Sequence, residues 1–192
     1  MYNHHISKFI INLIFAYFFI ILFLGITSTI SFAKEPPKIK TQQFQSWTVR
    51  CVEAEKKEQC EMLQTLKVNQ TNLQYTLAYN AFKNKSGKIK ESLLVVVPLG
   101  VNLQKRIALR FDGKNQLNIP YSKCETFGCI TTLNNNTKDK ITLAVFDKIK
   151  KGFEESSFLE IAVQGFSEKP VVIKTSVLGF KNAYNNLKSK IN

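Results

Sequence analysis

The spacing of the cysteines limits the possible folds of this chain more than any other pattern in the sequence. Residues 124–129 read Cys-Glu-Thr-Phe-Gly-Cys, so two cysteines stand five positions apart with a glycine directly before the second. Such a pair can close a small covalent loop, which persists only where thiols are oxidised. The chain is therefore expected to be an exported domain that disulfides stabilise.

The other two cysteines, Cys51 and Cys60, flank a charged loop between two expected strands. Four cysteines allow three pairings. We favour the local pairs Cys51–Cys60 and Cys124–Cys129, because each closes across a plausible turn. The alternative is a Cys₄ zinc site, but these spacings match no common zinc knuckle. No metal and no cofactor are therefore expected.

An export signal is expected in residues 1–33. Lys8 precedes an apolar run, and Ser31-Phe32-Ala33 supplies small residues at the two positions that a signal peptidase reads, so cleavage is predicted before Lys34. The alternative is an uncleaved anchor, because the run approaches the length that spans a bilayer. In either case the rest of the chain would lie outside the cytoplasm.

Positive charge dominates what remains after the signal. The whole chain has a net charge of +13, and the signal carries only one basic residue, so the exported chain has a charge of about +12. Such a charge favours anionic partners on a host or bacterial surface, including peripheral association with the outer membrane. Export makes nucleic acid the least favoured partner. The alternative is a solvated surface that keeps a secreted domain soluble.

Alternating apolar residues predict a mainly β domain over residues 44–192. Residues 34–43 hold a Pro-Pro pair and are expected to form an extended leader without a fold of its own. The expected strands are residues 47–51, 60–68, 73–82, 92–97, 101–111, 116–121, 158–163 and 170–177. Residues 92–97 form a continuous apolar run, which is typical of a strand buried on both faces. Seven or eight short strands indicate a β-sandwich or a partly closed barrel.

One or two helices are expected near the C-terminus. Residues 138–151 have apolar positions at helical spacing, and Gly152 is a reasonable C-terminal stop. A short terminal helix is also expected over residues 183–190.

Catalysis is disfavoured because the two histidines, His4 and His5, both lie in the expected signal. This excludes His-based acid–base chemistry and Ser-His or Cys-His nucleophiles from the exported chain. Carboxylate pairs or a lysine could still act without histidine. However, the few adjacent glutamates are expected to be solvated, so the protein is predicted not to be an enzyme.

Basic side chains cluster locally, and two of these clusters are candidates for anion binding. We hypothesise that they converge on one face, and that lysine-rich clusters of this kind attract anions diffusely. The first cluster is Lys83, Lys85, Lys88 and Lys90, and the second is Lys105, Arg106 and Arg110.

The framework of these motifs resembles the invasion-associated locus B (IalB) family of alphaproteobacteria over nearly all of the exported chain. The positions that carry the resemblance are Trp47, Cys51, Cys60, Pro98, Gly100, Cys124, Gly128, Cys129, Gly179 and Phe180. The resemblance implies an immunoglobulin-like β-sandwich in the periplasm, on the outer membrane or secreted. It also implies a role in bacterial entry into host cells, erythrocytes especially, with no catalytic residues.

Three functions remain open from the sequence. The first is a non-enzymatic envelope or secreted factor that aids host-cell invasion by surface binding. The second is a periplasmic envelope-assembly or chaperone-like module without host contact. The third is a small enzyme that uses carboxylates or a lysine.

Overall fold

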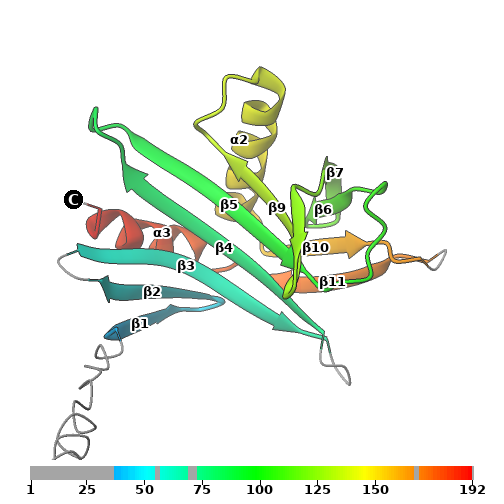
Figure 1. Cartoon of the computed structure of the whole chain (residues 1–192), viewed down its shortest axis with the longest axis horizontal. Coiled ribbons are helices and arrows are strands. Elements are labelled where there is room, and N and C mark those ends of the chain that lie inside the picture. The colour runs from blue at the N-terminus through cyan, green and yellow to red at the C-terminus, as the bar shows by residue number, and fades with distance from the viewer. Residues whose placement is uncertain (1–36, 55–56, 69–72, 167–168, 192) are drawn as a thin grey trace, which may run out of the picture. The chain divides into compact units, whose positions relative to one another are not determined.

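A seven-stranded antiparallel sheet is the larger layer of the domain. The computed structural model describes residues 37–54, 57–68, 73–166 and 169–191, which fall within one compact unit. The sheet order is β1-β2-β3-β4-β5-β9-β8, so the first five strands form a meander (Figure 1). Its strands are β1 (Ile39–Phe44), β2 (Trp47–Ala54), β3 (Lys57–Lys67), β4 (Gln74–Lys83), β5 (Ile89–Val97), β8 (Lys123–Glu125) and β9 (Gly128–Asn134).

A four-stranded antiparallel sheet in the order β11-β10-β6-β7 is the second layer. Its strands are β6 (Ile107–Phe111), β7 (Lys114–Ile119), β10 (Phe158–Val163) and β11 (Val171–Ser176). Buried side chains of both sheets belong to one hydrophobic core, so the predicted mainly β sandwich is confirmed.

Two helices complete the core. α2 (Lys140–Glu155) begins at Asp139, whose carboxylate accepts hydrogen bonds from the backbone N–H groups of Ile141 and Thr142. α3 (Phe180–Ser189) lies against β1, β2 and β3 and also contacts α2. Each helix buries one stripe of side chains, which for α2 consists of Phe146, Ile149 and Phe153.

The described residues form eleven strands, more than the seven or eight predicted. The eight predicted segments all contain strand, and β1, β8 and β9 are additional. Strands β8 and β9 were not predicted because we interpreted residues 124–129 as a loop. These residues form the turn of a hairpin in which Cys124 pairs with Cys129.

The predicted leader was partly wrong. Ile39–Phe44 is strand β1, which pairs along its length with β2. Its side chains are almost all exposed, so no apolar alternation marked it in the sequence, and only backbone pairing makes it a strand. The predicted signal, residues 1–33, lies outside the described residues.

Three other local predictions need correction. β5 is buried on one face and half-buried on the other, not buried on both. In residues 101–111 only Ile107–Phe111 is a strand, and Val101 forms an isolated bridge to Gly165. Gly152 does not end α2, which continues to Glu155. A Cβ at Gly152 would lie 2.5 Å from the Phe111 ring, so close packing and not helix termination explains this glycine.

Candidate functional site

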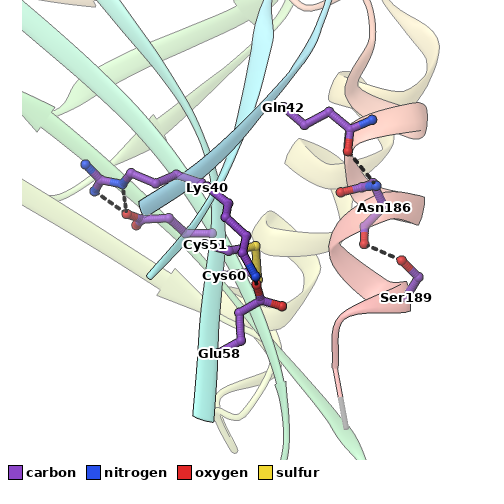
Figure 2. Close-up of a disulfide and its surroundings, with 9 residues drawn as sticks. Lys40, Gln42, Cys51, Glu58, Cys60, Asn186 and Ser189 are labelled. Carbon is purple, nitrogen blue, oxygen red and sulfur yellow. Dashed lines mark hydrogen bonds and ion pairs between the residues drawn. A yellow bond between two sulfur atoms is a disulfide. The ribbon is translucent and has the colours of Figure 1, made fainter. Parts of the chain in front are cut away.

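Both predicted disulfides are present, each between directly opposed residues of a hairpin. The Cα atoms of Cys51 and Cys60 are 4.0 Å apart, and those of Cys124 and Cys129 are 3.9 Å apart. Glu58 lies within reach of the first pair (Figure 2). Sulfur that is bonded to sulfur offers no thiolate to a metal, so the four cysteines do not form a zinc site.

Trp47 is a framework residue that joins the sheet to the helices. Its indole N–H donates to the Val177 carbonyl at 3.3 Å. Its ring makes edge contacts with Phe153 of α2 and Phe180 of α3, at centroid distances of 5.4 and 5.3 Å. This position therefore organises the core and offers no surface for a ligand.

Two framework glycines allow close backbone contacts. Gly179 has a φ of +92°, and a Cβ there would lie 2.2 Å from the Phe44 carbonyl oxygen. Gly128 has a φ of +152°, and a Cβ would lie 2.5 Å from the Val97 oxygen. Any residue with a side chain would be strained at both positions. The remaining framework pair, Pro98 and Gly100, lies in the loop that follows β5.

A buried polar network joins β5, α2 and α3. Glu91 is only 6% exposed, and its carboxylate accepts hydrogen bonds from Lys150 Nζ at 2.9 and 3.0 Å. Asn135 Nδ2 donates to the same carboxylate at 3.2 Å, and the Tyr184 hydroxyl also donates to it. Lys150 additionally donates to the Tyr184 hydroxyl at 3.1 Å.

The surroundings of this network raise the pKa values of its lysine and of two nearby tyrosines. Burial opposes the charge of Lys150, but hydrogen bonds to Glu91 and Tyr184 and the negative charge of Glu91 raise the lysine's pKa above its ordinary value. Burial, followed by the hydrogen bond with Glu91, raises the pKa of Tyr184. Burial and the nearby charge of Glu91 raise the pKa of Tyr79 far above its usual range. Because three side chains donate to its carboxylate, Glu91 forms a structural ion pair with Lys150 where β5, α2 and α3 meet.

A groove of about 780 Å³ opens beside the first disulfide. Its apolar wall includes Cys60, Phe82 and Leu187, and two of its lysines are Lys83 and Lys190. Its carboxylates are already paired at the surface, because Lys40 donates to Glu58 at 3.4 Å and Arg50 Nε donates to Glu61 at 3.0 Å. The described residues that line the groove therefore present both apolar and charged side chains but no nucleophile with an adjacent base.

The two basic clusters do not converge. The first surrounds the β4–β5 turn, at the start of β5, whereas Lys105 and Arg106 lie in the loop that follows the end of β5 (Figure 1). Nine residues of strand separate these ends by about 30 Å. Arg110 lies in β6 and forms an ion pair with Glu160 at 2.9 Å. The predicted single anion-binding face is therefore wrong, because strand length separates residues that we expected to be neighbours.

Glu91 and its partners were missed in the sequence. Glu91 stands directly before the apolar run of β5, and Lys150 lies among five lysines of one segment. The sequence around each residue is the same as that expected around a charged side chain exposed to solvent. Only the packing of α2 and α3 on the sheet shows that these residues meet.

Within the described residues, no helix has the length and apolar content needed to cross a bilayer.

Comparisons with known proteins agree with this architecture. A crystal structure of invasion associated protein B from Bartonella henselae superposes with a TM-score of 0.58 at 22% identity, covering 78% of this chain and 96% of that one. This likeness concerns the fold alone.

Sequence relatives extend the comparison. An invasion protein B homolog of Brucella abortus (strain 2308) is 25% identical over 171 residues, which cover 87% of this chain and 91% of the relative. A homolog from Brucella abortus biovar 1 gives the same values. The model of the family described as Invasion associated locus B (IalB) protein matches residues 47–188. The resemblance drawn from the cysteine framework is confirmed, and this chain belongs to the invasion-associated locus B family.

Proposed function

We propose that this protein is a non-enzymatic, exported factor that aids bacterial invasion of host cells, erythrocytes among them, by binding an anionic surface component. The observation that carries the proposal is the family match over residues 47–188. Export is supported by the signal pattern in residues 1–33 and by two disulfides, which persist in oxidising compartments.

The absence of an enzymatic role is supported by the chemistry of the exported chain. It has no histidine, its four cysteines are paired, and its buried carboxylate Glu91 is saturated by neighbours. None of these groups offers an activated nucleophile or a free general base.

The β4–β5 turn is the anion-binding element that we assign. The Asn84 side chain accepts hydrogen bonds from the backbone N–H groups of Ser86 and Lys88, at 3.0 and 2.9 Å, which fixes the turn. Lys83, Lys85 and Lys88 are exposed around it. A rigid turn that carries three cations concentrates positive potential without bidentate recognition, which suits a polyanionic glycan.

Charge reversal tests this assignment. The triple variant Lys83→Glu, Lys85→Glu, Lys88→Glu is compared with Lys138→Glu, Lys140→Glu, Lys148→Glu, which changes net charge equally at three exposed lysines around and on α2. We expect the turn variant to elute from heparin at clearly lower salt than the control variant. Equal elution of the two variants would show that only net charge matters and would remove the assigned site.

Invasion itself is tested in the bacterium. We expect a deletion strain to enter erythrocytes less often, and the turn variant to restore entry less well than the α2 control. Protease added to intact cells gives an independent readout, since a surface factor is cleaved. Full protection of the protein, with undiminished entry by the deletion strain, would favour a periplasmic envelope-assembly or chaperone-like module instead.

A further inference from the structure

Four large apolar side chains are exposed on three loops at the end of β5 that lies away from the lysine turn. Leu99 is 55% exposed, Leu103 is 57%, Phe127 is 69% and Phe166 is 86%. We call these four residues the apolar tip. The β5–β6 loop and the end of β10 lie at the same side of the sheets, away from the β4–β5 turn (Figure 1).

Backbone contacts hold these loops together. Val101 bridges Gly165, and Asn102 N–H donates to the Gln164 carbonyl at 2.8 Å, so the loops that carry Leu103 and Phe166 are joined. The third loop is closed by the Cys124–Cys129 disulfide, and Cys129 pairs with Val97 directly before the first loop. The apolar tip is therefore a fixed surface that the fold maintains at the cost of exposing apolar area.

Positive charge lies beside the tip. Lys105 and Arg106 follow Leu103 directly and are exposed, and no ion pair between described residues involves either of them. Glu125, the acidic residue on the described parts of these loops, is paired with Lys123 at 2.8 Å. Among the described residues, the tip thus combines exposed apolar anchors with two cations that no ion pair neutralises.

We propose that the apolar tip docks this protein onto the surface of an anionic lipid bilayer. Leu103 and Phe166 enter the boundary between headgroups and acyl chains, while Lys105 and Arg106 contact anionic headgroups. A bilayer of this kind is apolar and anionic within a few ångströms of depth, which matches the two kinds of side chain present. Leu103 and Phe166 stand on two separate loops, so each can insert to a shallow depth without belonging to one helix or strand.

A lipid partner at the apolar tip adds a second binding surface to the proposed function. Of that proposed function, it requires only that the protein is exported. The lysine turn and the apolar tip lie at opposite ends of β5, so each can be altered alone. One end could contact a glycan while the other is held on a membrane.

Vesicle flotation tests the proposal. The protein isolated from the cell envelope is mixed with vesicles of equimolar phosphatidylglycerol and phosphatidylcholine, and with vesicles of phosphatidylcholine alone. We expect binding to the anionic vesicles, and roughly a tenfold loss for Leu103→Ser with Phe166→Ser, because both anchors are removed. Lys105→Gln with Arg106→Gln is expected to weaken binding to anionic vesicles and to make it less sensitive to salt.

The control is Ile39→Ser with Phe82→Ser, which changes one aliphatic and one aromatic side chain outside the tip; these are 57% and 54% exposed, whereas Leu103 and Phe166 are 57% and 86% exposed. Equal flotation of the tip variant and the wild type, or an equal loss in the control, would overturn the proposal. So would tip-dependent self-association at equilibrium sedimentation without vesicle binding, which would assign the surface to a second copy of the chain. Heparin elution and erythrocyte entry do not enter this assay, so the proposed function and this inference can fail separately.

Discussion

Two buried regions where the helices pack against the sheets are held together in opposite ways. The aromatic cluster, Trp47, Phe111, Phe153 and Phe180, is apolar and buried, and its rings meet at centroid distances of 5.1 to 5.4 Å. The polar network, Glu91, Asn135, Lys150 and Tyr184, lies beside it and depends on hydrogen bonds to one carboxylate. Phe180 and Tyr184 stack at 6.0 Å, so the two regions are continuous.

The two regions contribute differently to the stability of the fold. Apolar contacts are non-directional and contribute most of the free energy of folding. A buried carboxylate contributes little net stability, but it tolerates only an arrangement that satisfies it. We therefore expect the aromatic cluster to supply more of the free energy that holds the helices on the sheets, and the polar network to favour the arrangement that satisfies the Glu91 carboxylate.

The largest effect is expected in the aromatic cluster. Phe153→Ala should lower the free energy of unfolding by about 4 kcal/mol, through lost transfer free energy and a cavity among three rings. Chemical denaturation followed by tryptophan fluorescence measures this, because Trp47 contacts Phe153.

The control is Phe166→Ala at the exposed apolar tip, which should change stability by less than about 0.5 kcal/mol. A loss of under about 1 kcal/mol for Phe153→Ala would mean that the cluster repacks freely and does not dominate the core.

An intermediate effect is expected from Lys150→Met. Glu91 would lose its cation, which should cost about 2 kcal/mol, less than for a fully buried pair, because the Lys150 side chain remains 23% exposed. Adding Glu91→Leu should recover most of that loss, since a matched apolar pair needs no charge compensation. A double-mutant cycle on unfolding free energies measures the coupling.

Lys151→Met is the matched surface control. Its ion pair with Glu155 is 3.9 Å long and exposed, so less than about 0.5 kcal/mol is expected. If the Lys150 and Lys151 variants lost the same free energy of unfolding, the buried polar network would contribute no more to stability than an exposed ion pair.

The smallest effect on the free energy of unfolding is expected from the loss of protons by the polar network at alkaline pH. The pKa values of Lys150 and Tyr184 are both raised in the folded protein. Their contribution is therefore fully present below the unfolded values, near 10. It is lost as pH rises further, because the folded state then binds more protons than the unfolded state.

Urea unfolding from pH 7 to 11 tests this. We expect stability to decline above about pH 10 more steeply in the wild type than in Lys150→Met. The same decline in both proteins would show that other groups control alkaline unfolding.

Much of the architecture could be predicted before the structure was known. The eight expected strand segments, both disulfides and both helices are present, because each depends on local spacing of apolar residues or cysteines. Strand β1 was not predicted because it has no apolar periodicity. Gly152 was wrongly interpreted as a helix stop because the ring that excludes a side chain there, that of Phe111, lies 41 positions away in the sequence.

Residue types and their spacing along the chain were enough to predict the β-rich class and the family, and to favour the two local cysteine pairs that the structure contains. The folded structure was needed to show that Glu91 and Lys150 meet, that the two clusters of cations lie toward opposite ends of β5, and that four exposed apolar side chains lie on loops at one end of that strand. Each of these depends on distances between segments remote in sequence. Such distances are set by strand length and helix docking, which local periodicity does not encode.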